Sequence, residues 1–239
     1  MRLMKKLIVL LPLTFLLAHA DMCQRRIEQL ADLQQRLVTR TLKNLNPGAW
    51  ARYEGGKAVY VGRQTQEGKT LYGIDVTLKK VPLQGWFTLQ PKPLKTPSKT
   101  YRVPMLAPHT LYVKNGGSTL QFKEDQIRSA ALLFGVDLGA LFSPLPTLMP
   151  KDCRKLPTLR TLTYQVGKKR IKAYKIEDAK GRYAIVSEAV PFGVVELYDG
   201  KKQGVFLQAF AFKNGQPAIT PAMRQKAIYL PISIRLSAR

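Results

Sequence analysis

From Ala49 onward, the chain alternates short apolar segments with glycine-containing turns, and this pattern constrains the fold more than any other feature. Glu54–Lys57 and Gln66–Lys69 combine glycine with polar residues, as tight turns do. Apolar side chains recur at every second position of the next segment, at Tyr72, Ile74 and Val76. Period-two alternation places such side chains on one face of a strand. This part of the chain therefore predicts an antiparallel β-meander.

A hairpin and a second series of strands extend the pattern. The hairpin surrounds Asn115-Gly116-Gly117, and the later strands are predicted at 162–166, 171–176, 182–187, 192–198, 205–212 and 228–236. The elements follow the order helix, strands, helix, strands, without the regular helix–strand alternation of parallel α/β proteins. We expect a mainly β (α+β) fold, a curved antiparallel sheet or half-barrel with an N-terminal amphipathic helix and one mid-chain helix.

The two helices have distinct sequence signals. Residues 24–45 place apolar side chains near one helical face, and Asn46-Pro47-Gly48 ends this segment. The apolar face consists of Ile27, Leu30, Ala31, Leu37, Val38 and Leu45. The mid-chain helix is predicted to start at Lys123-Glu124-Asp125 and to end before Gly135.

Two proline-rich stretches interrupt the strand pattern. Residues 82–108 contain six prolines with lysines between them, and residues 143–157 contain four prolines. Proline removes a backbone donor, so both stretches are predicted as irregular connections, the first with only a short strand near Trp86 and Phe87.

The first twenty residues have the features of a cleaved export signal. Arg2, Lys5 and Lys6 precede an apolar run from Leu7 to Leu17, and Ala18-His19-Ala20 offers small residues at a cleavage site. An uncleaved N-terminal anchor is the other interpretation. We predict a signal peptide at 1–20 and a single β-rich exported domain at 21–239, located in the periplasm or at a membrane-associated surface.

Positive charge is the strongest compositional feature. The whole chain has 39 Lys and Arg against 15 Asp and Glu, and no acidic residue follows Asp199. Such a surface attracts anionic lipid, lipopolysaccharide or another anionic envelope polymer. On the N-terminal helix, Arg25, Arg26, Arg36 and Arg40 are the candidate anion-binding residues, although a solvated basic face would look the same. No motif supports nucleic-acid binding.

Residues suited to catalysis or metal binding are scarce. The predicted mature chain contains one histidine, His109, and two cysteines, Cys23 and Cys153. These cannot form a histidine- or cysteine-rich metal site, and no nucleophile motif surrounds them. We predict no catalytic residue, metal or cofactor, while a hydrolase based on carboxylates stays open. In an oxidising compartment, Cys23 and Cys153 are expected to form a disulfide.

One strand is apolar on both sides. Phe206, Phe210 and Phe212 alternate with Val205, Leu207, Ala209 and Ala211, so both faces are predicted to be covered. The three phenylalanines are either buried in a central strand or line a cavity for a lipid or acyl chain.

The order of elements resembles that of the half-barrel lipoprotein carriers of the bacterial periplasm. Residues 187–195, SEAVPFGVV, look like a strand–turn signature of exported β-rich proteins. The resemblance implies a half-barrel fold. From the export signal, the net charge and the strand that is apolar on both sides, we expect a non-enzymatic exported protein of the bacterial envelope that binds an amphiphile or an anionic envelope polymer. The alternative is an assembly subunit that docks on an envelope protein through basic surfaces.

Overall fold

The computed structural model describes residues 22–39, 42–78, 80–95, 100–127, 156–200 and 204–229. The predicted signal peptide, Arg40, Cys153 and residues 230–236 lie outside these ranges, as do residues 128–155, which contain most of the predicted mid-chain helix and second proline-rich stretch.

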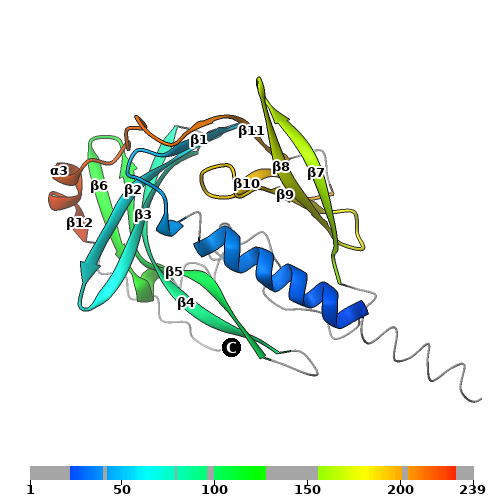
Figure 1. Cartoon of the computed structure of the whole chain (residues 1–239). Helices are drawn as coiled ribbons and strands as arrows, with labels where there is room; N and C mark the ends of the chain where they lie inside the picture. Colours follow the sequence, from blue (N-terminus) through cyan, green and yellow to red (C-terminus); the bar gives the residue numbers. More distant parts are fainter. Residues whose placement is uncertain are drawn as a thin grey trace, which may run out of the picture.

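The described strands form one strongly curved, open sheet, as predicted (Figure 1). Its order is β12-β6-β5-β4-β3-β2-β1-β11-β10-β9-β8-β7, so two antiparallel meanders meet where β1 pairs with β11. The first meander consists of β1 (Trp50–Tyr53), β2 (Gly56–Gln66), β3 (Lys69–Leu78), β4 (Val81–Lys95), β5 (Thr100–Asn115) and β6 (Ser118–Lys123). The second consists of β7 (Thr158–Val166), β8 (Lys169–Glu177), β9 (Tyr183–Val186), β10 (Val194–Tyr198) and β11 (Gly204–Ala211).

The N-terminal helix, residues 22–39, lies across the concave side of this sheet (Figure 1). All six predicted apolar residues of the segment are buried. Leu30, Leu33 and Leu37 pack against the second meander, at Ile176, Ala184 and Val186. Val38, Leu42 and Leu45 pack against the first meander, at Tyr60, Tyr72, Ile74 and Phe87. The helical segment therefore joins the two meanders through a shared apolar core.

The prediction of an irregular loop at 82–108 is wrong. This stretch forms most of the long hairpin of β4 and β5, with continuous pairing from Leu83 opposite Val113 to Lys95 opposite Thr100, apart from one bulge. Pro91 lies directly opposite Pro104. A proline fits a non-hydrogen-bonded position of an antiparallel pair, where an N–H would point away from the partner strand. Two prolines that face each other can therefore share one such position without breaking the ladder.

The convex side of the sheet is covered by the segment that follows β11. This segment includes a short helix, α3 (Pro221–Gln225), and a two-residue strand, β12 (Ile228–Tyr229). Thr220 caps α3 by accepting a hydrogen bond from the Met223 backbone. A strand was predicted at 228–236, but its described part pairs with β6 in parallel, not antiparallel. Because the helix covers one face and this segment the other, Tyr72, Ile74 and Asp75 of β3 are all buried.

A β-bulge in β11 overturns the predicted shared face of the three phenylalanines. Arg52 lies opposite Ala209, but Tyr53 lies opposite Leu207, so Gln208 is the extra residue. Paired residues share a face, and Phe210 therefore lies on the face of its partner Ala51. Phe206 lies on the opposite face, opposite Glu196 of β10.

Candidate functional site: an apolar cavity on the concave face

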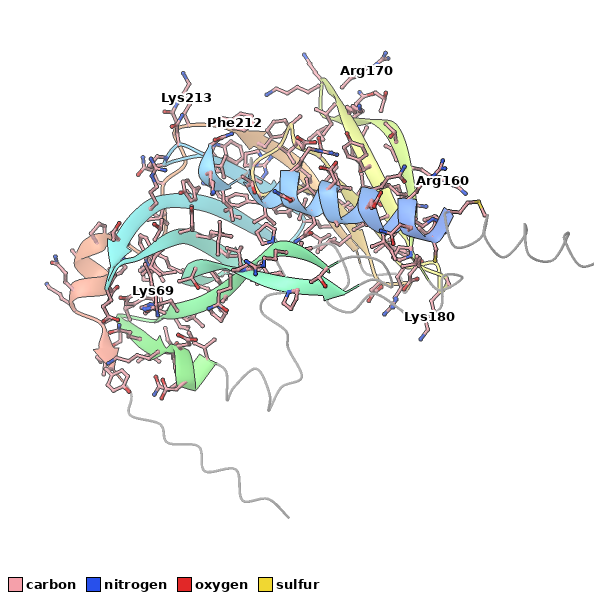
Figure 2. All side chains as sticks on the ribbon, turned by 60° about the horizontal axis from the view of Figure 1, so that its bottom comes forward. Lys69, Arg160, Arg170, Lys180, Phe212 and Lys213 are labelled. Carbon is pink, nitrogen blue, oxygen red and sulfur yellow. The ribbon has the colours of Figure 1, made fainter. Side chains whose placement is uncertain are left out.

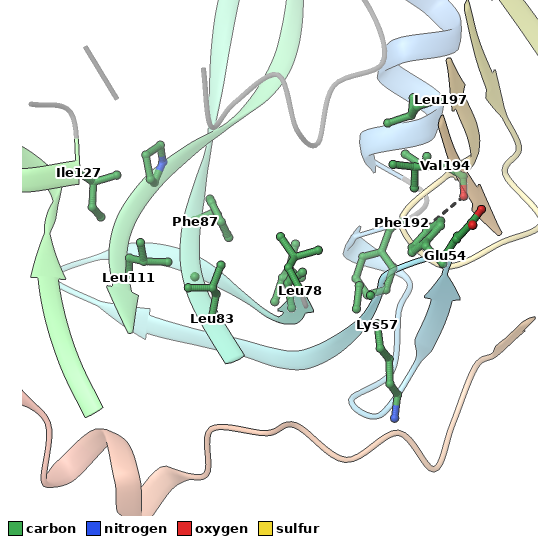
Figure 3. A pocket seen from close by; sticks show the side chains of 18 of the residues that line it. Glu54, Lys57, Leu78, Leu83, Phe87, Leu111, Ile127, Phe192, Val194 and Leu197 are labelled. Atoms are coloured by element: carbon green, nitrogen blue, oxygen red, sulfur yellow. Dashed lines mark hydrogen bonds between the residues drawn. The ribbon is translucent and has the colours of Figure 1, made fainter. Parts of the chain in front are cut away.

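A cavity of about 240 Å³ lies between the two meanders on the concave side of the sheet (Figure 3). Seven strands and the loop at Phe192 contribute to its wall. From the first meander it is lined by Tyr53, Ile74, Val76, Leu78, Leu83, Phe87 and Leu111, and from the second meander and its loop by Phe192, Val194, Leu197 and Val205. Nearly all of the wall is apolar, as in typical small-molecule pockets.

Two glycines leave the space in which the cavity forms. Gly85 lies opposite Ile74, and a Cβ there would meet the Phe87 ring at 2.4 Å, so the ring folds over the glycine backbone. A Cβ at Gly56 would lie 2.8 Å from the Thr77 carbonyl oxygen. Larger residues at either position would force the wall to shift, because real Cβ atoms do not approach other atoms so closely.

Phe192 separates the cavity from the core of the second meander. It packs against the apolar clusters of both meanders and has a φ of 66°, a rare value for a side chain of this size. Its loop is held by a hydrogen bond from the Ser187 N–H to the Gly193 carbonyl, 2.8 Å, and from the Ser187 hydroxyl to the Lys172 carbonyl, 2.6 Å. Such a strained backbone persists only when its surroundings fix it.

The mouth of the cavity combines exposed apolar side chains with few polar ones. Leu78 is 49% exposed and Val205 is 37% exposed, and Glu54, Lys57 and Thr110 supply the charged and hydroxyl groups of the wall. The Tyr53 hydroxyl donates to the Val194 carbonyl, 3.1 Å, and burial raises the pKa of this phenol. The hydroxyl proton of Tyr53 is therefore already donated to a group of the wall. Among the described lining residues, no histidine, cysteine or serine supplies a nucleophile.

The phenylalanines predicted as cavity residues do not line this cavity. Phe206 and Phe212 are 36% and 48% exposed, whereas Phe210 packs against the core of the second meander. The residue of β11 that reaches the cavity is Val205, opposite Leu197 of β10. The sequence signal for apolar residues on both sides of β11 was present, but the extra residue Gln208 places Phe206 and Phe210 on opposite faces.

The predicted arginine face of the N-terminal helix has mixed surroundings. Arg25 is exposed and Arg26 is half-buried, while Arg40 lies outside the described residues. Arg36 does not point away from the protein: it forms ion pairs with Asp32 and with Glu188, 2.9 Å to the latter. Its guanidinium also lies 6.0 Å from the centre of the Tyr174 ring. Arg36 therefore anchors the Phe192 loop to the helix.

Cys23 is half-buried near the start of the helix and is not a free thiol. Because Cys153 lies outside the described residues, the pairing of these two cysteines stays a prediction.

Two polar groupings lie outside the cavity. Glu196 is buried and accepts hydrogen bonds from the Tyr164 hydroxyl, 2.7 Å, and the Tyr183 hydroxyl, 2.5 Å. His109 lies in an open polar depression with Glu67 and Asp125, and its Nδ1 is 2.9 Å from the Thr110 hydroxyl. Within the described ranges, no group of three or more side chains is arranged to hold a metal ion.

Sequence comparison gives no match to any protein-family model and no significant match to a curated protein. Over the part of the chain that the structure describes, no helix has the length and apolar character to span a membrane.

Proposed function

We propose that this protein is an exported, non-enzymatic protein of the bacterial envelope that binds an amphiphile. The observation that carries the proposal is the apolar cavity, whose lining includes the exposed side chains of Leu78 and Val205. An apolar chain in this cavity would cover the exposed side chains at the mouth. Burial of apolar surface would supply most of the binding free energy.

The cavity limits the size of the bound group. Its volume of about 240 Å³ lies below the usual range of roughly 300–1,000 Å³ for ligand pockets. One acyl chain or another slender apolar group suits this space better than a complete phospholipid. Glu54 and Lys57 are the charged residues of the wall, and the Lys57 ammonium lies 5.4 Å from the centre of the Trp50 ring, which does not line the cavity. A polar head group would therefore remain at the mouth, in contact with solvent.

A cavity-filling substitution tests the proposal. Val76→Phe places a ring in the cavity, whereas Ile228→Phe adds the same ring on β12, where Ile228 is 50% exposed. The probe is a fluorescent fatty acid, titrated into each folded variant and into the wild type. Blocking two or three methylene positions should weaken binding about 15- to 60-fold in Val76→Phe, with no change in Ile228→Phe.

Equal affinity of the folded Val76→Phe variant and the wild type would refute binding in this cavity. Native mass spectrometry of the mature protein, purified without detergent from its own envelope, would identify the ligand. An added mass in the amphiphile range is expected, and its loss in Val76→Phe would assign the ligand to the cavity.

A further inference from the structure

The turn between β7 and β8 lies against the end of β11, although the two segments are far apart in the sequence. Lys169 Nζ is 4.6 Å from the centre of the Phe210 ring, and Phe210 packs edge-to-face on Phe212 with ring centres 6.0 Å apart. Lys213 follows directly. Figure 2 shows Arg170, Phe212 and Lys213 projecting from the same side of the molecule. We call Lys168, Lys169, Arg170, Phe210, Phe212 and Lys213 the tip patch.

Both chain segments that form the tip patch lack acidic residues. Residues 158–176 contain six basic residues and no Asp or Glu, and residues 204–229 also contain no Asp or Glu. Lys168, Lys169, Arg170 and Lys213 are all exposed. The tip patch therefore presents several cations with no carboxylate in its own segments to neutralise them, and it would attract an anionic surface.

An exposed aromatic side chain stands among these cations. Phe212 is 48% exposed, although Phe210 beside it is packed into the core of the second meander. A phenylalanine next to lysines suits a boundary where charged groups overlie an apolar layer, as phosphates overlie acyl chains in a bilayer. A soluble polyanion would use the cations but would leave the ring in water.

We propose that the tip patch docks the protein on the surface of an anionic lipid bilayer. The lysines and Arg170 bind lipid phosphates, and Phe212 enters the layer below them. This surface is distinct from the cavity and from the arginines of the N-terminal helix, of which Arg36 is already held by Asp32 and Glu188. The proposal does not depend on a ligand in the cavity.

Vesicle co-sedimentation tests the proposal. The probes are vesicles of phosphatidylglycerol and phosphatidylcholine, compared with vesicles of phosphatidylcholine alone. Each basic residue near an anionic surface contributes to the free energy of binding. Replacing Lys168, Lys169 and Arg170 by Gln should therefore lower partitioning onto anionic vesicles about 100-fold. The matched control replaces Arg63, Lys69 and Lys226 by Gln, which removes the same charge from exposed positions elsewhere, and it should lower partitioning less than about threefold. Lys69 lies away from Arg170, Phe212 and Lys213 in Figure 2.

A second variant distinguishes a bilayer from a soluble polyanion. Phe212→Ser should lower partitioning onto anionic vesicles about tenfold but leave binding to soluble polyphosphate unchanged. Equal loss in the two triple variants would overturn the proposal, as would vesicle binding that does not respond to Phe212→Ser. Val76→Phe should still bind vesicles, so failure of the cavity proposal and failure of docking give different results.

Discussion

Gln84 on β4 donates a hydrogen bond from Nε2 to the Asp75 carboxylate on β3, 3.1 Å, and neither side chain reaches solvent. The same carboxylate accepts the backbone N–H groups of Ala218 and Ile219, at 3.1 and 3.0 Å. Gln84 Oε1 accepts a hydrogen bond from Arg224, 2.6 Å. These contacts hold the segment after β11 against the convex side of the sheet.

We expect Asp75→Ala to lower the free energy of unfolding by about 3–5 kcal/mol, because it leaves the N–H groups of Ala218 and Ile219 without their acceptor. It also removes one of the two acceptors of Gln84 Nε2, the other being the Ile219 carbonyl. Urea unfolding measures the loss. Trypsin should also cleave faster at Lys213, Arg224 and Lys226 in this variant. Glu67→Gln is the control, since Glu67 is an exposed turn residue, and it should cost less than about 0.5 kcal/mol. Equal stability of the two variants would contradict the role assigned to Asp75.

The tyrosines at Glu196 predict a loss of stability in alkali. The hydrogen bond to Glu196, together with burial, raises the pKa of Tyr183 to about 12, and burial with the same carboxylate raises the pKa of Tyr164 as well. An unfolded tyrosine titrates near pH 10, so above this pH the unfolded chain releases protons that the folded protein keeps. The stabilisation is complete below pH 10 and is lost as the pH rises toward 12.

Each such tyrosine should contribute a slope of about −1.4 kcal/mol per pH unit in this window. Tyr183→Phe should therefore give a shallower decline of the free energy of unfolding between about pH 10 and 12. It should also be less stable at neutral pH, because Glu196 loses one donor. Urea titrations at several pH values measure both effects, and an unchanged slope would show that Tyr183 is not responsible.

Phe192 predicts a link between stability and cavity size. Phe192→Ala removes a ring that packs on both apolar clusters and should cost about 2–4 kcal/mol. Because the ring lines the cavity, the variant should also accept a bulkier apolar probe than the wild type does. Phe206→Ala, the same substitution at an exposed position that does not line the cavity, should cost less than about 1 kcal/mol. Thermal unfolding with and without probe compares them, and equal losses would contradict this account.

The predicted disulfide has a direct measurement. Intact-mass analysis of the mature protein should give a mass lower by two hydrogen atoms than that of the reduced chain. Because the pair would close a long loop, Cys23→Ser should lower the free energy of unfolding by about 3–5 kcal/mol. A mass equal to that of the reduced chain would rule out the Cys23–Cys153 pairing.

Local signals predicted most of the fold. The turns at Gly68 and Gly116 have positive φ values, as glycine-containing turns require, and the apolar periodicity of the N-terminal helix matches its buried face. The hairpin of β4 and β5 was missed because the prolines were treated as evidence against strands. A proline is compatible with a strand when it occupies a position that needs no N–H donor, and the sequence alone does not show which positions these are. Opposite Pro104, Pro91 is acceptable, and that pairing is not visible in either segment alone.

The candidate site was less accessible to sequence reasoning. Its wall is assembled from seven strands, so no short segment carries its pattern. The expectation that both faces of the strand at 205–212 are covered is wrong, because Val205, Phe206 and Phe212 are exposed. The assignment of the phenylalanines to one face also failed, because it assumed unbroken alternation. The extra residue, Gln208, is defined only by comparison with Arg52 and Tyr53 on the partner strand.

The sheet order also bears on how the chain reaches its native state. Of the described strand pairings, all but β1–β11 and β12–β6 join strands that follow each other in sequence. Each meander can thus form through short-range contacts, whereas pairing β1 with β11 requires closure of a long loop, which is slow. We expect this junction to form late, after two partly folded halves exist. Pulse-labelled hydrogen exchange during refolding should then show protection of the Glu54 amide, which donates to the Phe206 carbonyl at 3.0 Å, after that of Tyr72. A chain arrested before this step would expose both unpaired edges to intermolecular association.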